Sequence, residues 1–352
     1  MFQDCDGLAR IVLIGDDPLI RRAFVSLGLI NPLAALPVKT LNEIYSSVSM
    51  RRRYEVWFLR IGLASGGGAW WLRYLLMNPG RCGCAGNPRG KPVQVWATWF
   101  PPEGKPKSFI QGFSLDGLDL SARGQTPFHF RIGSQGIEDN SCQGALEIEG
   151  HSISWDLHCR STFRTALSDK GWIGFSRTPH SDARFSGRIT FDDRSFAGDP
   201  LGFGVQGHNS GYRHRDSWTW AHAYLPRPDG RVDTLEALVY DMPLGLVFRK
   251  AVLWHDGKAH VFRRLEERKR DLENLQWEFR CVTRGGLQMD VALDGRGSSL
   301  HRLPYLKTDC SGSFEVANNS LARAAVQVLQ PGGPIEKFET TTSAVLEMAG
   351  RG

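Results

Sequence analysis

The sequence has no apolar run long enough to form a membrane-spanning helix. Such a helix needs roughly 18 apolar residues, and no stretch of the 352 residues approaches that length. Hydrophobic residues make up 41% of the chain and charged residues 23%, which excludes both a disordered and a membrane-spanning protein. Residues 1–6 contain two acids and no basic residue, so we expect no secretory signal. The sequence therefore predicts a cytoplasmic protein.

The cysteines lack the even number and regular spacing of a secreted disulfide framework. The seven are Cys5, Cys82, Cys84, Cys142, Cys159, Cys281 and Cys310. Reduced thiols are the simpler interpretation. Cys82 and Cys84 form a Cys-Gly-Cys pair, but no second Cys or His pair lies at zinc-site spacing. We therefore expect no metal there and a loop with two free thiols.

Nucleic-acid-binding motifs are absent although the net charge is +6. No window combines basic and aromatic residues in a known recognition pattern. The densest basic clusters, residues 51–53 and 268–270, are expected to be solvated turns. The alternative is weak contact with an anionic membrane surface, to which about three such charges add only a few kcal/mol. The expected partner is an apolar small molecule, and the sequence does not indicate an oligomeric state.

Helical periodicity is nearly absent. It is confined to residues 40–48, where Thr40 is a candidate N-cap and Glu43 occupies the capping-box position. From Arg53 onward, aromatic and β-branched runs alternate with glycine and proline clusters, which is typical of strands and turns. About fifteen such runs predict an all-β protein of barrels or sandwiches.

The stretch of residues 202–224 concentrates side chains that can do chemistry. From residue 217 it alternates small with large side chains, and a strand sends alternate residues to opposite faces. One face carries Trp218, Trp220, His222 and Tyr224. This face suits a packed core or the wall of an apolar cavity.

A metal site in this stretch is considered because His208, His214 and His222 are close in sequence. Strand alternation places only His222 firmly on the face of the tryptophans. We therefore expect no metal here.

Four short motifs occur in order through the middle of the chain. They are Phe185-Ser186-Gly187-Arg188-Ile189-Thr190-Phe191-Asp192, Gly207-His208-Asn209-Ser210-Gly211, Trp218-Thr219-Trp220 and Val239-Tyr240-Asp241. This series resembles the lipocalin-like carotenoid 1,2-hydratase family, also called hydroxyneurosporene synthases, with the related AttH-like proteins and, more distantly, tocopherol cyclases. The resemblance covers roughly residues 53–350 and is sharp between 185 and 241. Ser210 stands where many members carry Trp.

The resemblance implies two lipocalin-like halves packed together, an apolar pocket and no organic cofactor. With an irregular connection expected near residues 161–180, it divides the chain into an N-terminal extension (1–52), a first β domain (53–180) and a second β domain (181–352). The implied reaction is hydration or cyclisation of an isoprenoid alkene, which would make the chain a hydro-lyase or a cyclase. The alternative is a non-catalytic carrier of a hydrophobic ligand that uses the same pocket.

The chemistry of alkene protonation assigns candidate roles, because a tertiary carbocation requires an acid, a dry pocket and an electron-rich wall. Asp241 is the expected acid, since a carboxyl on the strand face of Val239 would have a raised pKa. Trp218 and Trp220 would face the cation, at about 1 to 2 kcal/mol each. His208 or His222 would hold and deprotonate the water. Substrate contacts are also expected from Tyr224, Tyr240 and Asn209.

Each candidate has a structural alternative. Asp241 precedes Met-Pro and suits an exposed turn, and the two tryptophans suit a barrel core. The motif that contains His208 suits a turn with positive φ. Glu236, on the opposite strand face from Asp241, is the reserve acid. Glu55 and Arg73 are expected to form a cross-strand pair.

Overall fold

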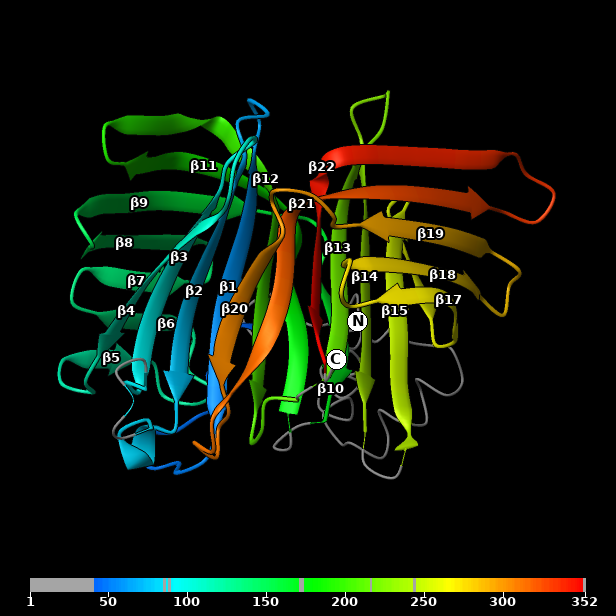
Figure 1. The fold of residues 1–352 in the computed structure, drawn as a ribbon. Coiled ribbons are helices and arrows are strands. Elements are labelled where there is room, and N and C mark those ends of the chain that lie inside the picture. Colours follow the sequence, from blue (N-terminus) through cyan, green and yellow to red (C-terminus); the bar gives the residue numbers. More distant parts are fainter. Residues whose placement is uncertain are drawn as a thin grey trace, which may run out of the picture. The chain divides into compact units, whose positions relative to one another are not determined.

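The computed structural model describes residues 41–350 apart from 85, 86, 88, 89, 171–173, 216, 243 and 244. These residues form two antiparallel sheets (Figure 1), and the predicted all-β class with two lipocalin-like halves is confirmed. Both sheets belong to one compact unit, Val38–Gly352. The greater part of the predicted N-terminal extension lies outside the described residues.

The first sheet follows the order β4-β3-β2-β1-β12-β11-β9-β8-β7-β6-β5, with β10 paired to β11. Its strands are β1 (Tyr54–Leu63), β2 (Ala69–Met77), β3 (Val93–Phe100), β4 (Lys107–Phe113), β5 (Leu118–Leu120), β6 (His129–Ile132), β7 (Gln135–Glu138), β8 (Ser141–Ile148), β9 (His151–Arg160), β10 (Thr165–Asp169), β11 (Gly174–Phe191) and β12 (Arg194–Gly211). A 3-10 turn, η1 (Pro79–Arg81), follows β2. The sheet curls on itself, so that Phe109 of β4 packs on Phe191 of β11 with ring centroids 5.6 Å apart.

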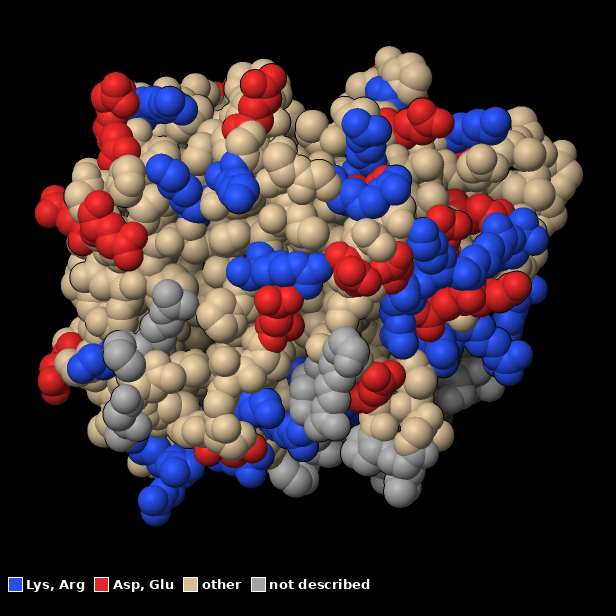
Figure 2. Space-filling view, in the orientation of Figure 1, with Lys and Arg blue, Asp and Glu red and all other residues tan. Residues whose placement is uncertain are grey.

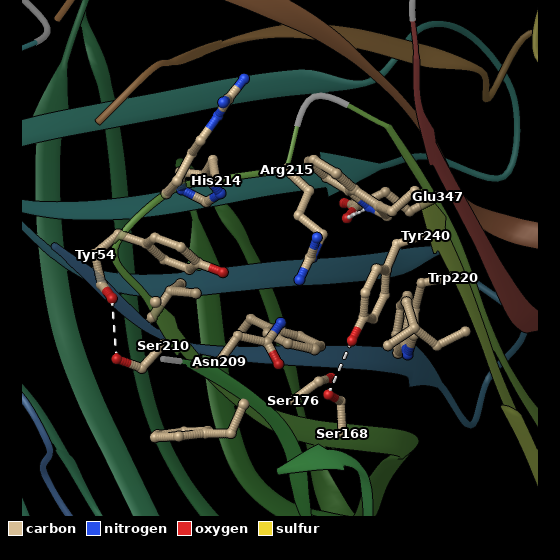
Figure 3. Close-up of a pocket in the computed structure, with 18 of the residues that line it drawn as sticks. Tyr54, Ser168, Ser176, Asn209, Ser210, His214, Arg215, Trp220, Tyr240 and Glu347 are labelled. Atoms are coloured by element: carbon tan, nitrogen blue, oxygen red, sulfur yellow. Dashed lines mark hydrogen bonds between the residues drawn. The ribbon is translucent and has the colours of Figure 1, made fainter. Parts of the chain in front are cut away.

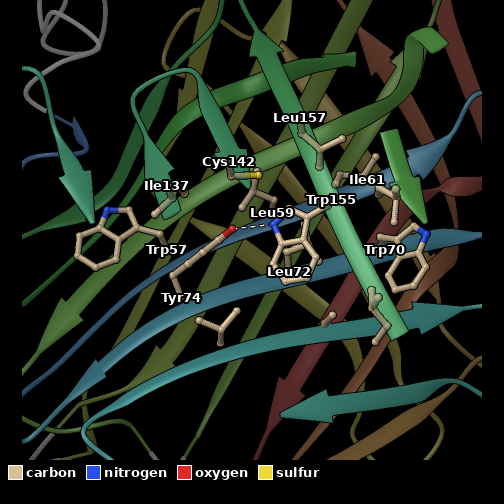
Figure 4. Packing of buried hydrophobic residues seen from close by; sticks show 14 of the residues in the cluster. Trp57, Leu59, Ile61, Trp70, Leu72, Tyr74, Ile137, Cys142, Trp155 and Leu157 are labelled. Carbon is tan, nitrogen blue, oxygen red and sulfur yellow. Dashed lines mark hydrogen bonds between the residues drawn. The ribbon is translucent and has the colours of Figure 1, made fainter. Parts of the chain in front are cut away.

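Apolar side chains fill the inside of this curl (Figure 4). Trp57, Trp70 and Tyr74 are fully buried there. Two polar groups of the aromatic core are paired, since Trp155 Nε1 donates to the Tyr74 hydroxyl at 2.7 Å and that hydroxyl donates to the Gln143 carbonyl at 2.9 Å. The indole N–H groups of Trp57 and Trp70 have no hydrogen-bond partner among the described residues. Strand alternation explains this core, because every second residue of β1 and β2 faces it.

The second sheet follows the order β16-β15-β14-β13-β22-β21-β19-β18-β17, with β20 paired to β21. Its strands are β13 (Trp218–Pro226), β14 (Val232–Asp241), β15 (Val247–His255), β16 (Lys258–Phe262), β17 (Leu265–Asp271), β18 (Gln276–Val282), β19 (Gln288–Asp294), β20 (His301–Leu306), β21 (Ser313–Leu329) and β22 (Ile335–Ala349). A second core, with Trp277 and Phe279 fully buried, lies on its inner face.

The chain passes from one sheet to the other between Gly211 and Trp218. The boundary expected at residues 180 and 181 falls inside β11, which belongs to the first sheet along its whole length. Residues 161–180 therefore form no connection between the halves. The irregular sequence there corresponds to register shifts in the pairing of β11, between Arg177 and His180 and again before Ala183.

The helix predicted over residues 40–48 is wrong for its described part. Only Leu41 is helical, and the following residues are irregular as far as a turn at 48–49. The backbone N–H groups of Tyr45 and Ser46 donate instead to the Glu55 carboxylate at 2.9 and 2.6 Å. This tertiary acceptor replaces the intrahelical acceptors on which the capping pattern depends.

The expectation of only reduced thiols is also wrong. Cys84 and Cys310 form a disulfide, with Cα atoms 5.4 Å apart, that joins the loop after η1 to the β20–β21 hairpin. The two cysteines are 226 residues apart in sequence, so no local spacing pattern indicates the pairing. Cys82 remains an exposed free thiol.

The two basic clusters are not simple solvated turns. Arg53 is fully buried, and its Nε donates to Ser210 Oγ at 3.1 Å. Residues 268–270 lie on β17, where Arg268 pairs with Asp290 at 3.1 Å. Figure 2 shows charges of both signs interleaved over this end of the second sheet. Among the described residues, no helix is both apolar and long enough to span a bilayer.

Candidate functional site

A cavity of about 150 Å³ lies where β1, β2 and β12 of the first sheet face β13, β14 and β22 of the second (Figure 3). Eight of the residues that line it are aromatic. They are Tyr54, Phe58, Trp71, Phe175, Trp218, Trp220, Tyr240 and Tyr305. The predicted alternation on β13 is responsible, because Ala221 and Ala223 turn into the second core while the tryptophans turn toward the first sheet.

Trp220 is the centre of this wall. Its ring meets Phe58 and Trp71 edge-on, with centroids 5.4 and 6.1 Å away, and those two rings stack on each other at 5.2 Å. Edge-to-face contacts fix ring orientation. The cavity therefore presents preformed π surfaces to a ligand.

Glu347 supplies the carboxyl of the cavity. It lies on β22, directly opposite Trp220 in the sheet, and is 8% exposed. Trp218 Nε1 donates to its Oε1 at 3.2 Å and Asn318 Nδ2 donates to its Oε2 at 3.1 Å. Burial raises the pKa of Glu347, an effect that Arg73 and these donors only partly oppose. Of the described residues that line the cavity, this is the only acid.

Arg73, on β2, is the buried cation of the cavity. Its guanidinium contacts two aromatic rings, 4.5 Å from the centroid of Trp96 and 4.3 Å from that of Tyr305, and these rings meet each other edge-on. The expected cross-strand pair with Glu55 does not form, because β1 places Phe58 opposite Arg73 and Leu76 opposite Glu55. Arg73 therefore lines the cavity, where its positive charge opposes the effect of burial on the pKa of Glu347 and adds to the effect of burial on the pKa of His214.

The remaining polar groups lie around the cavity at different depths. Asn209 Oδ1 is buried with no hydrogen-bond partner among the described residues, so it can accept a bond from a water or ligand. The Tyr240 hydroxyl bonds to Ser168 Oγ at 3.2 Å. His214 stacks on Tyr54 at 3.7 Å, and burial together with Arg73 lowers its pKa to about 3, which keeps the imidazole neutral.

Asp241, the acid expected from sequence, is not in the cavity. It is exposed at the end of β14, and its Oδ2 accepts a hydrogen bond from Ser217 Oγ at 2.7 Å. It shares a strand face with Val239, as expected, but that face belongs to the second core and Asp241 lies beyond its edge. The structure thus separates this carboxyl from Trp220.

The two histidines expected to handle water are also outside the cavity. His208 is fully buried against Trp57, and its Nε2 donates to Glu55 Oε1 at 2.9 Å while its Nδ1 donates to the Leu41 carbonyl at 2.7 Å. His222 is buried between the sheets, where its Nε2 donates to the Ser181 carbonyl at 2.7 Å. His208 thus uses both ring nitrogens to join segments of the fold, and His222 uses Nε2, while its buried Nδ1 has no hydrogen-bond partner among the described residues.

Of the predicted substrate contacts, Trp218, Trp220, Tyr240 and Asn209 line the cavity and Tyr224 does not. Tyr224 lines a second cavity, of about 480 Å³, further along the interface. It lies on the predicted face of β13, but a strand rises about 3.3 Å per residue. Four residues beyond Trp220, the side chain is too far along to reach the same space.

Glu236, the reserve acid, is buried behind Trp220. Its Oε1 accepts hydrogen bonds from Thr178 Oγ1 at 2.6 Å and Trp220 Nε1 at 3.1 Å. Burial raises the pKa of Glu236 to about 7. It does not line the cavity, so we assign it the role of orienting the indole of Trp220.

The raised pKa of Glu236 predicts a pH-dependent stability. Because its folded pKa of about 7 exceeds the ordinary 4.5, its contribution is fully present below about pH 4.5 and is lost as pH rises through 7. The difference is on the order of 3 kcal/mol. We expect urea unfolding of the wild type to show this loss between pH 5 and pH 8, and Glu236→Gln to abolish it. Glu266→Gln, an exposed control on β17, should retain the wild-type slope. A slope unchanged by Glu236→Gln would contradict the assignment.

One group of the described residues has metal-like spacing. Ligand atoms of His255, Asp256 and Glu336 lie within 4.8 Å of one another. The Arg227 guanidinium already pairs with Asp256 and with Glu336, each at 3.1 Å, and with Asp233 at 3.0 Å. A side-chain cation thus supplies the positive charge, and we assign the group to an ion-pair network.

Sequence reasoning missed Glu347 and misjudged Arg73. The available signal was a lone charged residue inside an otherwise apolar strand, as in Val345-Leu346-Glu347-Met348 and Trp71-Leu72-Arg73-Tyr74. A charge inside a buried strand requires a partner or a function.

The fold and cavity define a class, that of two-sheet, lipocalin-like β proteins with a cavity between the sheets. Two solved structures share the fold. One is a protein described as AttH from Nitrosomonas europaea, with a TM-score of 0.51 and 14% identity over 90% of this chain and 98% of that chain. The other is kievitone hydratase from Nectria haematococca, with a TM-score of 0.52 and 12% identity over 88% of this chain and 94% of that chain. No protein-family model and no curated protein matches the sequence. These likenesses show a shared fold.

Proposed function

We propose that the chain is an acid-initiated hydratase that adds water to an alkene of an isoprenoid-type substrate, with Glu347 as the proton donor. One observation carries this proposal: a buried carboxyl of raised pKa lies in a cavity walled by indole rings. The shared fold with a kievitone hydratase supports it. Cyclisation is the equivalent outcome where a nucleophile of the substrate replaces water.

The steps follow from the side chains of the cavity. Glu347 transfers its proton to the less substituted alkene carbon, and the other carbon becomes a tertiary carbocation. The π face of Trp220 stabilises that cation by about 1 to 2 kcal/mol when water is excluded. Arg73 stabilises the carboxylate that remains, since its positive charge opposes the effect of burial on the pKa of Glu347. A water molecule forms the C–O bond, and its proton returns to Glu347. This chemistry needs an acid and water, and no organic cofactor.

The position of the water is part of the same proposal. Asn209 Oδ1 is the free buried acceptor of the cavity, and His214 is a neutral imidazole in the wall. We assign these two residues the role that the sequence gave to His208 and His222. A positioned base or acceptor contributes to such a step by fixing the nucleophile near its target.

The size of the cavity limits how the substrate binds. A cavity of about 150 Å³ holds about one benzene-sized group. We therefore propose that only the reacting end of the molecule enters, with the remainder leaving through the mouth. The resemblance to carotenoid 1,2-hydratases suggests a carotenoid-like chain, and a prenylated phenol fits the same description.

A non-catalytic carrier is the second candidate, because the aromatic wall alone would bind an apolar ligand. A fluorescent apolar ligand would then bind without being converted.

The surface and the disulfide bear on where the protein works. The exposed Arg51 and Arg52 suit weak contact with an anionic surface. The Cys84–Cys310 disulfide favours an oxidising compartment over the cytoplasm expected from sequence.

The test is incubation of the purified protein with an acyclic carotenoid and a prenylated phenol in oxygen-18-labelled water. A hydratase yields a product that is heavier by one labelled water, whereas a cyclase yields an unlabelled isomer. Quenching of tryptophan fluorescence without any product would identify a carrier. If the protein forms no product and its fluorescence is not quenched, both the hydratase and the carrier hypotheses are wrong.

A further inference from the structure

Arg73 is a buried cation with unused hydrogen-bonding capacity inside the cavity. Its side chain is 4% exposed, and its Nη1 has no hydrogen-bond partner among the described residues. The rings of Trp96 and Tyr305, perpendicular to each other with centroids 5.4 Å apart, lie on adjacent sides of the guanidinium, and Nη1 is the part left for another group. A buried donor without a partner costs about 1 to 3 kcal/mol. Because Arg73 lines the cavity, an acceptor on a bound ligand can reach Nη1 and remove this cost.

Basic side chains outnumber acidic ones around the cavity. Arg73, Lys170, Arg213 and Arg215 line it against the single carboxyl of Glu347. In the described part of the chain, no carboxylate forms an ion pair with Arg73, Lys170 or Arg215. Because its pKa is raised, Glu347 neutralises these cations less than an ordinary glutamate would.

Arg215 extends this positive region toward the mouth. Its guanidinium lies 3.9 Å from the centroid of Tyr240, and Nη1 donates to the backbone carbonyl of Asp241 at 3.1 Å. Figure 3 shows the side chain reaching into the space between Tyr54 and Tyr240. A ligand in the cavity would therefore lie beside it.

We propose that the substrate carries a carboxylate, which binds to the guanidinium of Arg73 and is shielded by Arg215. The planar fork of a guanidinium matches a carboxylate in geometry as well as in charge. The apolar part of the same molecule lies against Phe58, Trp71 and Trp220. This inference rests on the proposed function in one respect, that this cavity is the substrate site, and it specifies the substrate class as an unsaturated carboxylic acid.

The test uses equilibrium binding, followed by quenching of tryptophan fluorescence at pH 8, where carboxylic acids are ionised. The probes are dimethylacrylic, geranic and farnesoic acids, their methyl esters, and geranyl phosphate. We expect the acid that fits best to bind about 10- to 100-fold more tightly than its ester. Arg73→Gln should reduce this preference to about 1, and Arg215→Gln should reduce it by several-fold, with ester affinity nearly unchanged. Arg188→Gln, an exposed control on β11, should leave both affinities unchanged.

Three results overturn the proposal: equal binding of acid and ester by the wild type, a full preference retained by folded Arg73→Gln, or binding of no acid in the series. Tighter binding of geranyl phosphate than of geranic acid would contradict the assignment of a carboxylate as the anionic group of the substrate. Circular dichroism shows whether each variant is folded. If Arg73→Gln does not fold, the ratio of acid affinity to ester affinity is measured instead in Arg73→Lys and Arg215→Gln. Hydration of a neutral alkene with no preference for acids would contradict this inference and support the proposed function. A preference for acids without any product would support this inference and contradict the proposed function.

Discussion

Glu347→Gln is expected to lower kcat for alkene hydration by at least about 100-fold, the smallest contribution usual for a positioned general acid. The amide keeps the shape of the side chain but has no proton acidic enough to transfer to an alkene carbon. It can still accept one of the two hydrogen bonds that Trp218 and Asn318 donate to the carboxyl. The loss should therefore fall on kcat more than on KM, as measured by initial rates of product formation.

The pH profile distinguishes a proton donor from a merely structural carboxyl. The protonated form of Glu347 is the active one, and its pKa is raised by burial. Activity should therefore persist above the pH at which an ordinary glutamate has ionised, and fall as pH rises further. Glu339→Gln, on an exposed position of the same strand, is the matched control and should retain the wild-type rate. Full activity of folded Glu347→Gln would transfer the acid role elsewhere, and Asp241→Asn would then be tested first.

Glu55→Ala is expected to lower the free energy of unfolding by about 3 to 5 kcal/mol, because it leaves a buried partner without compensation. Glu55 and His208 are both fully buried. Both ring nitrogens of His208 face acceptors, Glu55 Oε1 and the Leu41 carbonyl, so the imidazole donates from both. The same carboxylate accepts the N–H groups of Tyr45 and Ser46. One residue thus holds the segment that precedes β1.

The measurement is urea unfolding of Glu55→Ala, His208→Ala and the double variant. We expect the double variant to lose less than the sum of the single losses, since removal of both partners leaves no uncompensated charge. Glu315→Ala breaks the exposed pair with Arg302 and should cost much less. The pKa of Glu55 is lowered by its partners, so its contribution is present above the pKa of the unfolded chain and lost as pH falls through the lower folded value. Additive single losses would argue against a coupled pair.

Strand content was predictable because it depends on local periodicity. The alternation on β13 placed Trp218 and Trp220 on one face and the alanines on the other, and the structure confirms that division. Local pattern also suggested a helix before β1, which the structure does not form over residues 42–48. The carboxylate of Glu55 supplies the acceptors there, and no local pattern indicates such a tertiary partner.

The sequence by itself determined the all-β class and the aromatic face of β13 with Trp218 and Trp220, because a period of two follows from the geometry of one strand. Tyr240 and Asn209, which also line the cavity, were expected from the motifs of the family resemblance. Tertiary structure alone decided which acid faces the indoles. Asp241 and Glu347 both lie on strands of the second sheet, but Asp241 comes at the exposed end of its strand and Glu347 lies opposite Trp220. Pairing between β13 and β22 brings that carboxyl into place from a distant part of the chain, and strand register between remote segments is not encoded in local spacing.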